Sequence, residues 1–231
     1  MTHPLLDGAV IRPSGEGAFA VEFGDAVDPA LARRVRALDA ALAAAAPAGL
    51  REAVPTHRSL LVLHDPDMED PPSLLSALPD TVAEAPQPAA WGVPVCLEGD
   101  AAEDLEEAAG ILGLSPGTFR EALLDSELTV AMFGFAPGLA YLSGLDPALD
   151  LPRRAAPRPP MPAGSLIVAG GQAALASVPM PTGWYVVGRA AVRLFDPDRD
   201  PIVPFAPGDR IALRAVSEAA LAQGREPERI G

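Results

Sequence analysis

Lysine is absent from this sequence, because all 17 of its basic residues are arginine. The absence excludes a lysine that forms a Schiff base, a lysine of a phosphate-binding loop, and a lysine that carries biotin or lipoate. Chemistry that needs such a residue must therefore be supplied by another chain.

Histidine and cysteine are almost as scarce, with three and one residues. No two histidines have the spacing of a helical metal pair and no acidic spacing stands out, so we expect no metal site. His57 and His64 are then ordinary residues of a small sheet. Cys96 lies in an apolar strand pattern, which predicts a buried, unreactive thiol. Ser165 is not in a nucleophile elbow and no histidine in the C-terminal half can serve as its base, so the catalytic residues stay unassigned.

The sequence also lacks an apolar run of the ~20 residues that span a bilayer, and its N-terminus does not read as a signal peptide. Its net charge of −14 is the reverse of the basic footprint of nucleic-acid binders. A single cysteine permits no internal disulfide, which suits a reducing compartment. We therefore expect a cytoplasmic chain with neither membrane nor nucleic acid as partner.

The first part of the chain predicts a small α/β domain over residues 1–85. Residues 18–24 partly alternate as a strand, and Asp28-Pro29 supplies a cap and a first-turn proline for a helix that runs to the alanines before Pro47. Strands at 50–55 and 59–64 and a short helix near 70–78 follow. This order is that of a split βαβ unit. The Pro- and Ala-rich segment 79–90 is the expected linker.

The remainder, residues 86–231, predicts a second domain. A short strand at VPVCL precedes two helices, one capped by Asp100 and one started by Ser115. From residue 127 onward, short apolar runs alternate with Gly and Pro turns, which is typical of an antiparallel sandwich or barrel. We expect the tail at 224–231 to fray.

Three segments of this second domain carry residues suited to binding. FGFAPGLAYLSGL at 133–145 combines Gly, Pro and aromatic rings, and 152–165 holds three arginines in a proline-stiffened loop suited to carboxylate or phosphate. AGGQ at 169–172 and PTGWYVVGR at 181–189 add an amide, an indole and a guanidinium. The candidate ligand-binding or interface residues are Phe135, Pro137, Gly138, Tyr141, Arg153, Arg154, Arg158, Gly170, Gly171, Gln172, Trp184 and Arg189.

Each of these segments also has a purely structural interpretation. The arginines can offset the nearby Asp146 and Asp150 in a solvated loop, AGGQ can be a tight hairpin with a surface glutamine, and Trp184 can be a core residue. The residue types favour binding and electrostatic stabilisation over complete catalysis, because no strong general base accompanies them.

Taken together, FGFAPGLAYLSGL, LPRRAAPRPPMPAGSLIVAGGQ, PTGWYVVGRA and VRLFDPDRDPIVPFAPGDRI resemble the allophanate-hydrolase-subunit-1-like family. This family includes the B subunit of the Pxp-type 5-oxoprolinase and the Kip-type inhibitor of a sporulation kinase. The resemblance implies an α+β fold with a small α/β N-terminal domain and a cyclophilin-like antiparallel β-barrel. It also implies a C-type companion subunit and an A-type hydrolase subunit, which together cleave 5-oxoproline to glutamate with ATP.

The sequence departs from the family pattern at several positions. Leu123 stands where relatives usually carry a histidine, and Leu139-Ala140 replaces an aromatic-proline pair. Ala173, Thr182 and Ala190 replace a threonine, a glycine and a threonine. The departures leave open whether the family site is complete.

Three functions follow as hypotheses. The first is the B subunit of an ATP-dependent amide (lactam) hydrolase, inactive alone, with ATP acting through the complex. The second is a carboxyltransferase-like subunit of a urea- or allophanate-metabolising enzyme, whose biotin must sit on another chain because lysine is absent. The third is a regulatory module that inhibits a histidine kinase through an apolar groove.

Overall fold

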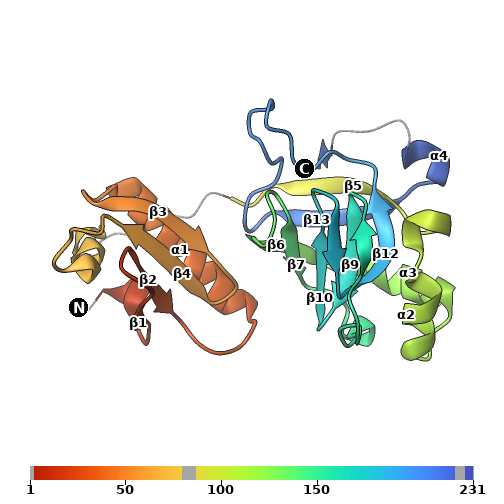
Figure 1. The fold of residues 1–231 in the computed structure, drawn as a ribbon, viewed down its shortest axis with the longest axis horizontal. Coiled ribbons are helices and arrows are strands. Elements are labelled where there is room, and N and C mark those ends of the chain that lie inside the picture. Colours follow the sequence, from red (N-terminus) through yellow and green to blue (C-terminus); the bar gives the residue numbers. More distant parts are fainter. Residues whose placement is uncertain (1–2, 80–86, 222–226, 231) are drawn as a thin grey trace. The chain divides into compact units, whose positions relative to one another are not determined.

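The computed structural model describes residues 3–79, 87–221 and 227–230 and contains two units, Met1–Gln87 and Pro88–Gly231. In Figure 1 the first unit runs from red to orange and the second from yellow to blue. The expected linker at 79–90 falls largely on residues 80–86, which lie outside the described ranges.

The first unit is a four-stranded antiparallel sheet with one long helix. Its strand order is β1-β2-β4-β3, so β4 lies between β2 and β3, which is the split βαβ arrangement expected from the sequence. The helix begins as predicted, since the Asp28 carboxylate accepts a hydrogen bond from the Ala30 N–H at 2.7 Å. The elements are η1 (Pro4–Leu6), β1 (Val10–Pro13), β2 (Ala18–Glu22), α1 (Pro29–Ala45), β3 (Leu50–Pro55), β4 (Ser59–His64) and η2 (Pro71–Ala77).

Two details of this unit differ from the sequence prediction. The segment expected as a helix near 70–78 is the 3₁₀ helix η2, which two successive prolines start. Strand β1 was not predicted, because all four of its residues are exposed and carry no alternating pattern. The core of the unit lies between α1 and one sheet face, where Leu38 and Leu42 pack with Val21 and Leu60.

The second unit is a closed β-barrel, as expected. Seven strands pair in the ring β12-β9-β10-β7-β6-β13-β5, and β5 closes it by pairing with β12. The strands are β5 (Ala90–Cys96), β6 (Leu128–Phe133), β7 (Ala140–Ser143), β9 (Ser165–Ala169), β10 (Gln172–Leu175), β12 (Tyr185–Ala190) and β13 (Arg210–Ala215).

One pair in the ring is parallel, which corrects the expectation of a purely antiparallel barrel. Strand β13 runs parallel to β5 with Ile211 opposite Trp91, whereas every other pair of the ring is antiparallel. The reason is geometric: directions cannot alternate all the way around a ring with an odd number of strands, so one parallel pair is required. Strands β5 and β13, near the two ends of this unit, make that pair.

A small ribbon and several helices complete the unit. β8 (Arg158–Met161) and β11 (Met180–Thr182) pair with each other outside the ring. The helices are η3 (Gly99–Ala102), α2 (Leu105–Ile111), α3 (Pro116–Asp125), η4 (Pro147–Leu149) and α4 (Glu218–Leu221). Ser115 caps α3 as expected, accepting from the Thr118 N–H at 3.1 Å. No helix in the described ranges has the length and apolarity that a membrane crossing requires.

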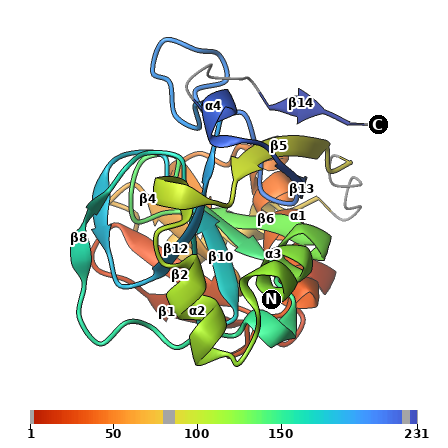
Figure 2. The same ribbon diagram turned by 90° about the vertical axis from the view of Figure 1, so that its right-hand side faces the viewer.

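Two predictions at element ends were wrong. Asp100 was expected to cap a helix, but it lies inside η3. The residue before α2 is Asp104, and its carboxylate does not cap that helix because it is bound to other groups. The tail at 224–231 was expected to fray; residues 224–226 and 231 lie outside the described ranges, but Glu228–Arg229 forms β14, which pairs with β5 beside the ring (Figure 2). β14 finds its hydrogen-bonding partners at Gly92 and Trp91 of β5, and no local sequence pattern indicates this pairing.

Candidate functional site

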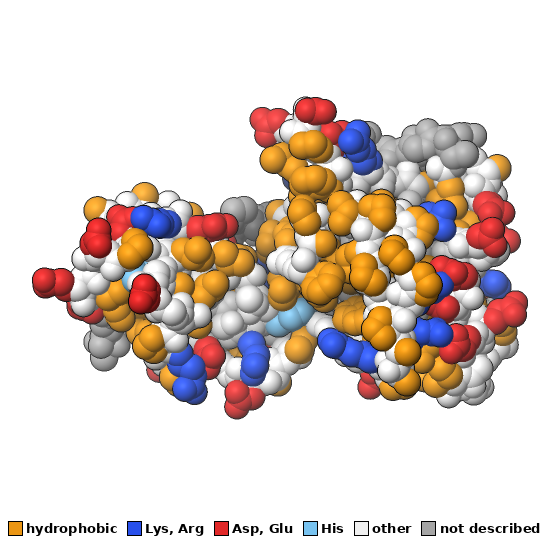
Figure 3. Space-filling model, viewed as in Figure 1, with side chains coloured by type: hydrophobic (Ala, Val, Ile, Leu, Met, Phe, Trp, Pro, Cys, Tyr) orange, Lys and Arg blue, Asp and Glu red, His pale blue; other side chains and the backbone are white. Residues whose placement is uncertain are grey.

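The candidate site is a hollow on the outer face of the barrel, with a volume of about 220 Å³. Side chains alternate along the strands: Ala173 and Leu175 of β10 belong to the main core of the unit, whereas Ala174 belongs to a separate outer cluster. The space-filling view shows apolar side chains gathered over this part of the unit (Figure 3). The hollow is lined by Phe135, Leu139, Tyr141, Arg153, Ile167, Ala174, Met180, Pro181, Thr182, Gly183 and Trp184.

Two aromatic rings and one arginine give the hollow its chemical character. Tyr141 and Trp184 meet edge to face with ring centroids 5.9 Å apart, and the Arg153 guanidinium lies 6.0 Å from the centre of the indole. Burial raises the pKa of the Tyr141 hydroxyl, although the charge of Arg153 opposes the shift. The phenol therefore stays protonated at neutral pH and can donate a hydrogen bond. The site offers flat apolar faces beside one cation.

Phe135 stands at the mouth of this hollow in an unfavourable conformation. Its side chain is 78% exposed and its φ is 68°, the left-handed region that a bulky residue rarely adopts. An exposed ring in a strained backbone costs roughly 1–2 kcal/mol and adds little to the core. Such a residue is characteristic of a binding surface.

Neighbouring contacts fix the turn that carries Phe135. Gly138 has a φ of 71°, which glycine adopts without strain, and an added Cβ would lie only 3.1 Å from the Phe195 side chain, so a larger residue would force that neighbour to shift. The Pro137 carbonyl accepts a hydrogen bond from the Ser177 hydroxyl. The turn is thus held against the loop that contains Phe195 and against Ser177, which lies two residues beyond the end of β10.

The four predicted arginines separate into two groups. Arg154 pairs with Glu107 at 2.8 Å and with Asp104 at 3.4 Å, and its guanidinium lies 4.9 Å from the centre of the Tyr185 ring. Its hydrogen bond to Glu107 is the main cause that raises the pKa of Arg154. Arg158 pairs with Glu103 at 2.5 Å and with Asp104. These two arginines attach the proline-rich loop to η3 and α2.

Arg189 is not part of this loop: it lies in β12 and donates to the Asp100 carbonyl of η3 at 3.3 Å, which ties the strand to that helix. Arg153 differs from the other three, because it lines the hollow. The Arg154 N–H donates to the Gly183 carbonyl at 2.8 Å, which ties the loop to the rim of the hollow and leaves Arg153 beside Trp184. The sequence also allowed these arginines to offset the charges of Asp146 and Asp150. Among the described residues, however, the acidic partners of Arg154 and Arg158 are Asp104, Glu103 and Glu107.

The glycines of AGGQ form the hairpin between β9 and β10. Gly170 and Gly171 have φ values of 59° and 67°, which is the backbone of a two-residue turn with both residues left-handed. Gln172 is opposite Ala169 at the start of β10. None of these three predicted residues lines the hollow. The structure therefore brings together Phe135, Tyr141, Arg153 and Trp184 from the predicted set.

Sequence reasoning missed most of the apolar lining and one buried carboxylate. Ile167 and Ala174 were assigned only to strands, although alternation could have placed them on one face. Asp104 is 7% exposed and accepts from the Val186 N–H at 2.7 Å in addition to its arginines. Its partners lie more than 40 positions away along the chain, so no local signal indicated this role.

Two of the departures from the family pattern line the hollow, and the others lie in the main core of the unit. Leu123 and Ala173 are fully buried in the main core, and Ala190 is buried in the same cluster. Leu139 and Thr182 are different, since both line the hollow, and the Thr182 hydroxyl accepts from the Trp184 N–H at 3.0 Å. Within the described ranges no cluster of His, Cys, Asp and Glu could hold a metal ion.

Comparison with known proteins agrees with this architecture. The family model for the carboxyltransferase domain, subdomains C and D, matches residues 9–205. The chain belongs to this family. The B subunit of the Bacillus subtilis 5-oxoprolinase is 30% identical over 223 residues, which cover 90% of this chain and 93% of that protein.

Solved structures extend the comparison of this carboxyltransferase-domain chain. The crystal structure of TTHA0988 is 32% identical with a TM-score of 0.77, covering 95% of this chain and 41% of that one. The chain thus spans less than half the length of that relative. The urea amidolyase of K. lactis has a TM-score of 0.75 over 96% of this chain and 16% of its own, but at 18% identity it supports the fold alone.

Proposed function

We propose that this chain is the B subunit of an ATP-dependent 5-oxoprolinase complex, in which it contributes binding rather than complete catalysis. The observation that carries the proposal is the likeness to the B subunit of the Bacillus subtilis 5-oxoprolinase over nearly the whole length of both proteins. That name implies companion chains, and we assign these to an A-type hydrolase subunit and a C-type companion.

The chemistry of the hollow is consistent with this substrate. 5-Oxoproline is a small ring with one carboxylate and one lactam. Arg153 supplies the cation for the carboxylate, and Tyr141 and Trp184 supply faces for the ring. Arg154 and Arg158 are occupied by acidic partners, so substrate recognition rests on Arg153.

The nucleotide chemistry belongs to the partners in this proposal. Opening a lactam requires activation, which ATP provides when it phosphorylates the lactam oxygen. This chain has no lysine and no phosphate-binding loop, so ATP acts through the complex. The isolated chain is therefore expected to form no glutamate, and robust ATP-dependent glutamate formation by it would contradict this division of labour.

The test is reconstitution with both companion subunits and measurement of glutamate formed from 5-oxoproline and ATP. Arg153→Ala is expected to raise KM by about 10-fold or more, because a charge-assisted hydrogen bond is lost. Arg12→Ala is the matched control, since Arg12 is an exposed arginine of the first unit, paired with Glu22. An inactive complex would refute the function. An active complex in which both variants behave alike would refute only the assignment of Arg153.

The family description favours a second candidate, a carboxyltransferase-like component that acts on urea or an amide. Its biotin would sit on another chain, because lysine is absent here. Gentle purification from the host distinguishes the two: a biotinylated companion supports the carboxyltransferase, and an ATP-dependent hydrolase subunit supports 5-oxoprolinase. Recovery of a histidine kinase would instead support the regulatory hypothesis.

A further inference from the structure

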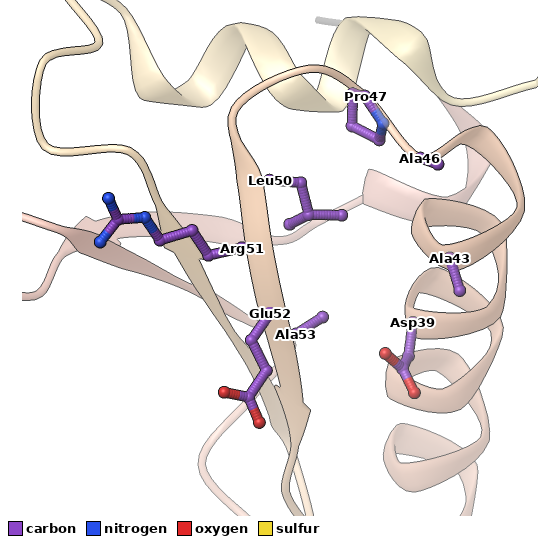
Figure 4. A pocket seen from close by; sticks show the side chains of 8 residues that line it. All are labelled: Asp39, Ala43, Ala46, Pro47, Leu50, Arg51, Glu52 and Ala53. Carbon is purple, nitrogen blue, oxygen red and sulfur yellow. The ribbon is translucent and has the colours of Figure 1, made fainter.

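A second hollow lies in the first unit, between the C-terminal half of α1 and strand β3, with a volume of about 300 Å³. Figure 4 shows Leu50 and Ala53 of β3 on one side of it and Asp39 and Ala43 of α1 on the other. None of the residue roles proposed above involves this groove. Its lining is Asp39, Ala43, Ala46, Pro47, Leu50, Arg51, Glu52 and Ala53.

One wall of the groove is the free edge of a sheet. Strand β3 pairs only with β4 among the described strands. Thr56 N–H donates to the Ser59 carbonyl, and the register puts Val54 opposite Leu61. Because hydrogen-bonded pairs alternate along antiparallel strands, the N–H and C=O of Ala53 point away from β4, toward the outside. Neither group has a backbone partner among the described residues, and Ala53 itself lines the groove.

The other wall is a smooth stripe of α1. Ala43 follows Asp39 at helical spacing, and the left-handed residue Ala46, which ends the helix, continues this shallow lining. Small side chains on both walls leave the space that larger incoming side chains would fill. The groove thus combines an open backbone edge with an apolar floor, the combination that peptide-binding domains use for strand addition.

The carboxylate of Asp39 indicates that a positively charged side chain would suit the groove. Asp39 is half-buried, projects from α1 toward the strand in Figure 4, and has no hydrogen-bond or ion-pair partner among the described residues. Burial raises its pKa, because the desolvated charge is not compensated. The chain carries a net charge of −14, so a basic partner is attracted while a second copy is repelled.

We propose that this groove receives a short extended segment of a partner protein, which adds to the edge of β3 and directs a lysine or arginine at Asp39. Its apolar side chains lie over Ala43 and Ala46. The bulge at Arg51 and the proline at Pro55 interrupt regular pairing on either side of Ala53, which limits the segment to a few residues. This interaction is independent of the 5-oxoprolinase assignment.

The probe is a fluorescein-labelled heptapeptide, Val-Thr-Lys-Thr-Val-Thr-Val, added to the full chain and followed by anisotropy. In an added strand its lysine and valines face the groove and its threonines face away. Saturable binding is expected, with the peptide that carries Glu in place of Lys binding more weakly. Asp39→Asn should weaken the lysine peptide roughly threefold to fivefold, the range of a half-exposed ion pair.

The matched variants are prolines on the two edges of the same sheet. Ala53→Pro removes the outward N–H of β3 and is expected to weaken the peptide at least tenfold. Ile11→Pro makes the same change on the opposite edge strand, β1. Ser14 N–H donates to the Ala18 carbonyl, so by alternation the N–H of Ile11, opposite Val21, also points away from the sheet. It should leave binding unchanged. Circular dichroism verifies that both variants fold.

Amide exchange on the unaltered chain provides a second readout that needs no variant. The Ala53 N–H should gain protection when the peptide is added, and the Ile11 N–H should not. Absence of saturable binding, equal losses in the two proline variants, or protection away from β3 would each overturn the proposal. So would a concentration-dependent dimer that Ala53→Pro abolishes, because the occupant would then be a second copy of the chain.

Discussion

Replacing Asp104 tests whether the arginine loop is a structural attachment. The carboxylate is buried, accepts from the Val186 N–H and pairs with Arg158 and Arg154. Asp104→Ala removes all three interactions at once. We expect it to destabilise the second unit, and not merely to alter ligand binding.

The expected loss in free energy of unfolding depends on the interactions that each partner of Asp104 retains. The Val186 N–H loses its acceptor in a buried position, which costs about 1–3 kcal/mol. Breaking a buried ion pair outright costs about 3–5 kcal/mol. Here the loss is smaller, because Arg158 keeps Glu103 and Arg154 keeps Glu107. We therefore expect about 3 kcal/mol for Asp104→Ala and about 1–2 kcal/mol for Asp104→Asn, which retains an acceptor for Val186.

Tryptophan fluorescence makes the measurement specific to one unit. Both tryptophans, Trp91 and Trp184, lie in the second unit, so urea unfolding followed by their emission does not report the first. Glu107→Gln is the control: its side chain is 51% exposed. It should change the free energy of unfolding by less than about 1 kcal/mol.

A small effect of Asp104→Ala would refute the reasoning. If the free energy of unfolding changed by less than about 0.5 kcal/mol, as at an ordinary surface position, the loop would not depend on its acidic partners. Arg154 and Arg158 would then be available for an anionic ligand, as the sequence alone allows. The proposal that Arg153 acts without them would have to be withdrawn.

Three further outcomes are expected. Asp209→Ala should lower the free energy of unfolding of the second unit by about 3 kcal/mol in the same urea assay, because this buried carboxylate accepts from Ala89 N–H, Trp91 Nε1–H and Ala206 N–H at 2.8–2.9 Å. Phe135→Gly should not lower stability by more than about 1 kcal/mol, because glycine tolerates the φ of 68° and the ring it removes is exposed; a larger loss by fluorescence would mean that the ring packs. Burial raises the pKa of Asp39 above its ordinary 3.8, so the ionised form destabilises the first unit. As the pH falls from neutral through that raised pKa, the protection factors of the α1 amides, which are corrected for the intrinsic pH dependence of exchange, should rise, and Asp39→Asn should abolish this rise.

The sequence predicts best where the pattern that defines an element is local. Strands 50–55 and 59–64 have the bounds observed for β3 and β4, because turn residues such as Gly49, Pro55 and Asp65-Pro66 mark their ends. Helix α1 begins at the predicted cap for the same reason. The barrel follows from short apolar runs separated by turns.

Elements that depend on a distant partner were missed. Strands β1 and β14 are entirely exposed, and their strand conformation depends on pairing with β2 and β5. The residues of these two strands form backbone hydrogen bonds with the neighbouring strand and do not fill a core. Their sequences therefore show no periodic pattern of apolar residues.

The arginine loop shows why composition cannot assign a binding site. Arg153 and Arg154 are adjacent, yet one lines the hollow and the other pairs with α2. Successive side chains of an extended segment point to opposite sides, so neighbours face different surroundings. Which of them meets an acid depends on where Asp104 and Glu107 lie in space. Three of the four predicted arginines therefore hold the scaffold together, and two of them, Arg154 and Arg158, attach the loop that places Arg153 beside Trp184 at the rim of the hollow.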